Sequence, residues 1–102
     1  MGVRIVLTTE GDPAAADRLA SALVEGRSAA CITMHTVRSR YRWNGAVHDA
    51  EEIQMVIKTT PEGVDDVVAV ILEHHSYDLP EVVALEAHAG AAYGAWIHGQ
   101  VG

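Results

Sequence analysis

The sequence predicts an α+β domain in which the elements follow in the order β-α-β-β-α-β and a short helix ends the chain. A unit made of a strand, two threonines and a capped helix occurs twice, beginning at Val3 and again at Ile53. Between the two units, two long strand-like segments meet at Asn44-Gly45, a dipeptide typical of tight hairpins. This order is the split β-α-β, or ferredoxin-like, arrangement, an antiparallel sheet covered on one face by two helices.

The first strand and the first helix occupy residues 3–26. Val3 to Thr8 form a continuous apolar run rich in β-branched residues, as expected of a strand buried on both faces. Gly11-Asp12-Pro13 then supplies a turn, an N-cap and a proline at the first helical position. An amphipathic helix ending near Gly26 is expected, because apolar residues recur at helical spacing at Ala16, Leu19, Ala20, Leu23 and Val24.

Ala29–Trp43 and Val47–Thr59 are predicted to form one long antiparallel hairpin. The tolerance of Asn44-Gly45 for positive φ favours a two-residue type I′ turn, which places Trp43 opposite Ala46 and fixes every later pair. Charged pairs then lie toward the tip of the hairpin and apolar pairs toward its base. The predicted pairs include Arg40 with Asp49, Arg38 with Glu51, Met34 with Met55, Ile32 with Ile57, and Cys31 with Lys58.

The second unit repeats the signals of the first. Thr60-Pro61 again places a capping residue before a proline, and the helical stripe that follows consists of Val64, Val67, Val68, Ile71 and Leu72. Glu81 to Ala87 is the fourth predicted strand. A short terminal helix carries Tyr93, Trp96 and Ile97 at helical spacing. Residues 1–102 are thus expected to form a single domain.

The charge and the apolar content restrict the class of protein. The net charge of −7 would repel a polyanion, so nucleic acid is not expected as a partner. No apolar stretch approaches the roughly 20 residues that cross a bilayer, and the N-terminus is expected to be a strand and not a signal peptide. Cys31 is the one cysteine and cannot form an internal disulfide, so we expect a soluble, cytoplasmic protein.

The second face of the sheet is expected to be buried by self-association. Val3 to Leu7 and Ile53 to Ile57 are apolar on both sides, whereas the two helices cover only one side. Symmetric association of identical chains is the common way to bury such a face. The hairpin is longer than the mean strand of about 5–6 residues and is the natural arm for this contact.

Two residues are candidate metal ligands. Lys58 opposite Cys31 would favour the thiolate and so a soft metal, although a lone cysteine in a strand is also typical of a small buried side chain. His75 could join Asp78, Glu81 or Cys31, but it could equally be a polar loop residue. Since no zinc pattern occurs, a metal site would have to be assembled from separate segments or subunits.

Arginine and aromatic side chains give further candidates. Arg38, Arg40 and Arg42 alternate onto one hairpin face and could bind an anion, but two of them face carboxylates and are more simply structural. Only Arg42, opposite Val47, lacks such a partner. The aromatic residues could wall a pocket or could serve packing alone; they are Tyr41, Trp43, Tyr77, Tyr93 and Trp96.

Several segments together resemble the CutA family of divalent-cation tolerance proteins. The resemblance covers nearly the whole chain. It rests on Ala29-Ala30-Cys31, Tyr41-x-Trp43-x-Gly45, Glu52 followed by Ile57-Lys58-Thr59, His75-x-Tyr77-x-x-Pro80-Glu81, and Tyr93-x-x-Trp96. One segment departs from the family, because His75-Ser76-Tyr77-Asp78 stands where His-Pro-Tyr-Glu is usual. The missing proline predicts a looser loop.

The resemblance implies a cytoplasmic homotrimer that takes part in tolerance of copper or other divalent metals and is not an enzyme. It implies Cys31 and His75 as metal ligands, Cu²⁺ or another divalent ion as the metal, and no organic cofactor. A cleft between subunits, as in the similar PII signalling trimers, would hold a small ligand near Lys58, Tyr77, Glu81, Trp43 and Trp96. Two alternatives stay open: an enzyme or accessory protein acting on a small anionic metabolite held by Arg42, Lys58 and His75, and a PII-like signalling or structural scaffold.

Overall fold

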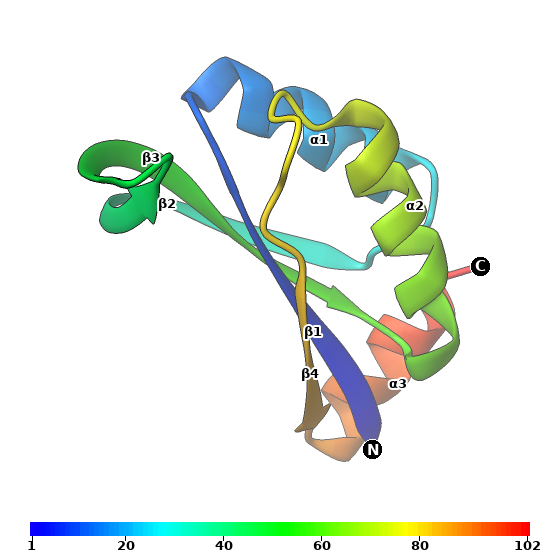
Figure 1. The fold of residues 1–102 in the computed structure, drawn as a ribbon. Helices are drawn as coiled ribbons and strands as arrows, with labels where there is room; N and C mark the ends of the chain where they lie inside the picture. Colours follow the sequence, from blue (N-terminus) through cyan, green and yellow to red (C-terminus); the bar gives the residue numbers. More distant parts are fainter.

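The computed structural model describes residues 1–102 and contains the predicted elements in the predicted order (Figure 1). The four strands form one antiparallel sheet in the order β2-β3-β1-β4, which confirms the α+β, ferredoxin-like prediction. β2 and β4 each begin two residues later than predicted. The elements are β1 (Gly2–Glu10), α1 (Pro13–Glu25), β2 (Cys31–Trp43), β3 (Ala46–Thr59), the 3₁₀ turn η1 (Pro61–Gly63), α2 (Val64–His74), β4 (Val83–His88) and α3 (Ala91–Gln100).

Both predicted caps form, but the second caps a different element. The Asp12 carboxylate accepts a hydrogen bond from the Ala15 N–H at 2.8 Å and so caps α1. The Thr60 hydroxyl accepts from the Gly63 N–H at 3.0 Å, and this bond closes η1 and not α2. The cap and the proline therefore start one tight turn, and α2 begins where that turn ends.

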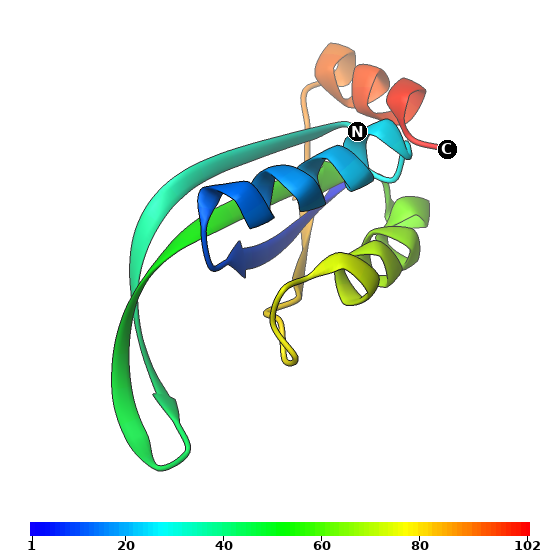
Figure 2. The ribbon, with the colours of Figure 1, turned by 90° about the horizontal axis from the view of Figure 1, so that it is seen from above.

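The hairpin of β2 and β3 has the predicted register along its whole length. Asn44 and Gly45 both have positive φ, 50° and 77°, as a type I′ turn requires. All thirteen residues of β2 pair as predicted, from Cys31 with Lys58 to Trp43 with Ala46. The hairpin extends beyond the helices as a curved arm (Figure 2), and it accounts for the elongated shape of 45 × 23 × 21 Å.

Only one of the two predicted charge pairs is an ion pair. Arg40 Nε lies 2.7 Å from Asp49 Oδ1. Arg38 lies opposite Glu51 but forms no ion pair with it. Both residues of the Arg40 pair are well exposed, so its contribution to stability is small.

The core lies between one face of the sheet and the helices α1 and α2. The fully buried side chains of Val6, Met55 and Ile57 on the sheet meet Leu19 and Leu23 of α1, and Val67 and Ile71 of α2 complete the cluster. The predicted stripe of α2 is only partly buried, because Leu72 is 62% exposed. None of the helices is long and apolar enough to cross a membrane.

The opposite face of the sheet is apolar and only partly covered. α3 lies at one end of it: the Lys58 ammonium sits 5.8 Å from the ring centroid of Tyr93, and Ile97 is fully buried. At the level of Lys58, Ile5 pairs with Leu85, and two residues farther along β1, Leu7 pairs with Val83. Leu85 and Val83 are each 45% exposed. The expected second apolar face is therefore present, and part of it is open in the single chain.

Candidate functional site

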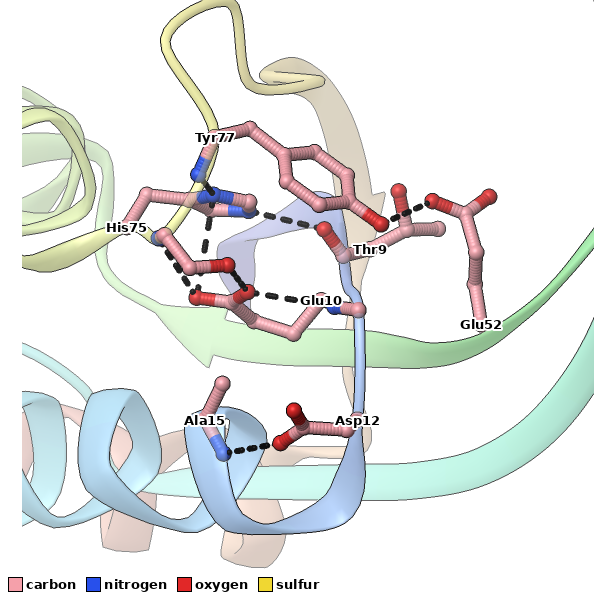
Figure 3. Close-up of polar contacts among 9 residues, drawn as sticks. Thr9, Glu10, Asp12, Ala15, Glu52, His75 and Tyr77 are labelled. Carbon is pink, nitrogen blue, oxygen red and sulfur yellow. Dashed lines mark hydrogen bonds and ion pairs between the residues drawn. The ribbon is translucent and has the colours of Figure 1, made fainter.

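The loop after α2 is held against the end of β1 by a buried carboxylate (Figure 3). Glu10 is fully buried, and its oxygens accept hydrogen bonds from the Ser76 N–H at 3.1 Å, the Ser76 hydroxyl and the Gly11 N–H at 3.2 Å. A proline at position 76 could donate neither of the two serine bonds. Ser76 thus ties the loop to Glu10 by two bonds in place of the stiffness that a proline would give, and these bonds oppose the expected loosening.

His75 is built into the same contact. Its Nε2–H donates to the Thr9 carbonyl oxygen at 2.7 Å, and its Nδ1 accepts from the Tyr77 N–H at 3.0 Å. These two bonds require the neutral ring with its proton on Nε2. The side chain is 1% exposed, and Nδ1 lies 3.6 Å from Glu10 Oε2. Both ring nitrogens are thus engaged within the subunit.

His75 and Glu10 position Tyr77, whose hydroxyl donates to Glu52 Oε2 at 2.8 Å (Figure 3). The rings of His75 and Tyr77 are tilted against each other with centroids 5.0 Å apart. A Cβ at Gly11 would lie 3.3 Å from the Tyr77 ring, so glycine makes room for that ring. Burial, then the hydrogen bond to Glu52, then the negative charges of Glu52 and Glu10 raise the pKa of Tyr77 above its ordinary value.

Tyr77 and Glu52 border a hollow of about 670 Å³ between the hairpin arm and the loop that follows α2. Its size is within the range of sites for small molecules. One wall is the outer part of β2, and the other is the loop leading to β4. The lining residues are Thr9, Ser39, Arg40, Tyr41, Trp43, Glu52, Tyr77, Asp78, Leu79 and Glu81.

The structure divides the predicted site residues into two groups. Trp43, Tyr77 and Glu81 line the hollow. His75 does not line it, but its Nδ1 accepts a hydrogen bond from the Tyr77 N–H. Trp96 is instead part of α3, and Lys58 lies beside that helix. The Lys58 ammonium approaches the Tyr93 ring, which stacks on the Trp96 ring with centroids 5.5 Å apart. The half-buried Cys31 pairs with Lys58 and belongs to this second group.

Within one chain the two candidate metal ligands are far apart. The His75 ring contacts Thr9 of β1. Cys31 pairs with Lys58, which pairs in turn with Ile5 of β1. Thr9 and Ile5 are about 13 Å apart along the strand. No group of three or more histidine, cysteine or carboxylate side chains is arranged to hold a metal ion in the single chain.

The three cations proposed for an anionic metabolite are also not brought together. Arg42 is eleven residues along β2 from Cys31, the residue that pairs with Lys58. Arg42 therefore lies roughly 35 Å along the strand from Lys58. His75 lies at neither position. A single chain therefore offers no anion site made of these residues.

Sequence reasoning gave no site role to the two buried carboxylates, Glu10 and Glu52, although Glu52 is among the residues that carry the family resemblance. Glu10 follows an apolar run and Glu52 precedes one, so each resembles an ordinary charged residue at a strand end. A signal for Glu52 was nevertheless present, because the register places it opposite Val37 on the hairpin face that also carries Tyr41 and Trp43. No comparable signal marked Glu10, whose partner Ser76 is 66 residues away.

Comparison with known proteins agrees with this fold and covers the whole site. The family model of the CutA1 divalent ion tolerance protein matches residues 4–100. A divalent-cation tolerance protein CutA from Pectobacterium atrosepticum is 35% identical over 96 residues, which are 92% of this chain and 87% of that protein.

Solved structures give the same result. CutA from Synechococcus elongatus has a TM-score of 0.94 at 36% identity and covers 99% of this chain and 91% of its own. The divalent cation tolerance protein CutA1 from Thermus thermophilus has a TM-score of 0.92 at 33% identity, covering 98% and 99%. Because the family model and these relatives span nearly every residue, the chain belongs to the CutA1 divalent ion tolerance protein family.

Proposed function

We propose that this protein takes part in divalent-cation tolerance as a homotrimer that binds a metal ion or a small ligand at clefts between its subunits. The match of almost the entire domain to a family named for divalent ion tolerance carries the proposal. The hollow beside Tyr77 is the candidate cleft for a small ligand. We place the protein in the cytoplasm; a structural relative from Archaeoglobus fulgidus is described as periplasmic, so cell fractionation is the direct test.

Self-association is supported by the surfaces that the single chain leaves open. β2 and β4 are the outer strands, so each has one edge of unpaired backbone N–H and C=O groups. Val83 and Leu85 remain 45% exposed on the face opposite α1 and α2. Packing identical copies against one another covers both features at once, and the family resemblance implies three copies.

For the metal we propose copper, held by Cys31 and His75 from different subunits. Thiolate and imidazole are donors that copper prefers. The proposal has a structural condition: His75 can bind a metal only if one ring nitrogen gives up its bond to Thr9 or to Tyr77. Metal binding at His75 should therefore disturb the loop that carries Tyr77.

Calorimetric titration of the intact protein with Cu²⁺, and with redox-inert Zn²⁺, tests this assignment. Replacing both Cys31 and His75 with alanine should abolish binding, whereas His74→Ala, a neighbouring exposed histidine, should leave it unchanged. Light scattering on the same samples should give three times the subunit mass. Equal binding by the parent and the double variant would remove these two residues as ligands, and a monomeric mass would remove the trimer.

A further inference from the structure

Glu52 is a buried carboxylate that no cation of its own chain neutralises. The residue is 7% exposed, and the single hydrogen bond to its side chain comes from the Tyr77 hydroxyl. No lysine, arginine or histidine forms an ion pair with it. Its second oxygen accepts no hydrogen bond within the chain and, unlike the buried Thr8 hydroxyl, stays in contact with solvent, and the residue lines the hollow. A buried carboxylate without a cation is costly, so this one is suited to a positively charged guest.

Most of the other charged side chains around the hollow are also acidic. Asp78 and Glu81 also line it, and neither forms an ion pair within the chain. Arg40 is the one basic lining residue, but it alternates onto the other face of β2 and its Nε already contacts Asp49 at 2.7 Å. The raised pKa of Tyr77, caused partly by the charges of Glu52 and Glu10, agrees with a negative potential at this point.

Aromatic rings form part of the wall on the hairpin side. Tyr41 and Trp43 are 44% and 49% exposed, and both lie on the hairpin face that carries Glu52. Tyr41 stacks on His48 with ring centroids 5.8 Å apart, which limits its motion. Aromatic faces attract ammonium and guanidinium groups and pack against the carbon atoms that carry them.

From the uncompensated Glu52, the acidic rim and the aromatic wall, we infer that the hollow binds an organic cation, a small molecule with an ammonium or guanidinium group. The charged group lies against Glu52 and Glu81, and the apolar body lies along Tyr41 and Trp43. The inference rests on the proposed function only in taking this hollow as the small-ligand cleft. It excludes the anionic metabolite as the guest and does not depend on metal binding at Cys31 or His75.

Calorimetric titration of the intact protein with three probes of one shape tests the inference. Benzylamine, benzyl alcohol and benzoate share a ring and differ in charge. We expect benzylamine to bind on the order of tenfold more tightly than benzyl alcohol, as a charge-assisted contact provides, and benzoate to bind most weakly. Glu52→Gln keeps the shape and a hydrogen-bond partner for Tyr77 but should remove the preference for the amine.

Two further variants keep the test decisive. Glu81→Gln lies on the exposed rim and should reduce the amine preference even where Glu52→Gln fails to fold, whereas Glu62→Gln, an exposed carboxylate on η1, should not change it. Equal affinities for benzylamine and benzyl alcohol, or a preference kept in both hollow variants, would overturn the inference. Binding of Cu²⁺ without an amine preference refutes this inference alone, and an amine preference without Cu²⁺ binding refutes only the metal assignment.

Discussion

Ser76 joins the loop after α2 to β1 through one buried carboxylate, and this contact can be weakened without touching the hollow. Ser76→Ala removes the hydroxyl bond to Glu10 and keeps the backbone bond. Because Glu10 is fully buried, we expect the free energy of unfolding to fall by about 1–3 kcal/mol. Denaturant unfolding at fixed protein concentration measures it. Ser21→Ala, on an exposed position of α1, is the matched control and should change stability by less than about 0.5 kcal/mol.

Tyr77 should make stability depend on alkaline pH. Its pKa is raised in the folded protein, so the folded state holds the phenolic proton more tightly than the unfolded chain does. The resulting stabilisation is complete below the unfolded pKa of about 10 and is lost as the pH rises through the folded value. Unfolding measured at several pH values above 10 should show this loss, and Tyr77→Phe should show a shallower one. Identical slopes would contradict the role given to the Glu52 contact.

At the scale of elements, the two-residue turn of the hairpin arm constrains the backbone most, because both of its residues have positive φ. Gly45 has a φ of +77° and open space around it, so Gly45→Ala meets a backbone penalty and no steric contact. We expect a loss of about 1–2 kcal/mol in unfolding free energy. Gly99→Ala in α3 meets open space at a helical position, where alanine is favoured by about 0.5–1 kcal/mol. A Gly45 variant as stable as the Gly99 variant would disprove the type I′ assignment.

The hairpin also shows why much of the fold could be predicted and why the site could not. A two-residue turn fixes every pair of an antiparallel ribbon, so one local signal at Asn44-Gly45 determined the position of Cys31 opposite Lys58. The hollow depends instead on how the loop after α2 lies against the hairpin arm, through contacts such as Tyr77 with Glu52 that no local pattern encodes. The resemblance places Lys58 and Trp96 with Tyr77 at a cleft between subunits, and this stays a prediction; within the single chain both residues lie at α3.

For the whole molecule, the proposed self-association should depend on the open part of the second sheet face. Leu85→Asp places a charge on that face, at a side chain that is 45% exposed in the single chain and would be buried by self-association. We expect the trimer to dissociate, so that light scattering gives a lower mass and the unfolding temperature falls and becomes dependent on protein concentration. Leu72→Asp introduces the same charge at a 62% exposed position of α2, on the other side of the sheet, and should leave the mass unchanged. If Leu72→Asp dissociates the protein and Leu85→Asp does not, the subunits meet through the helical face and the strand edges and not through the open sheet face.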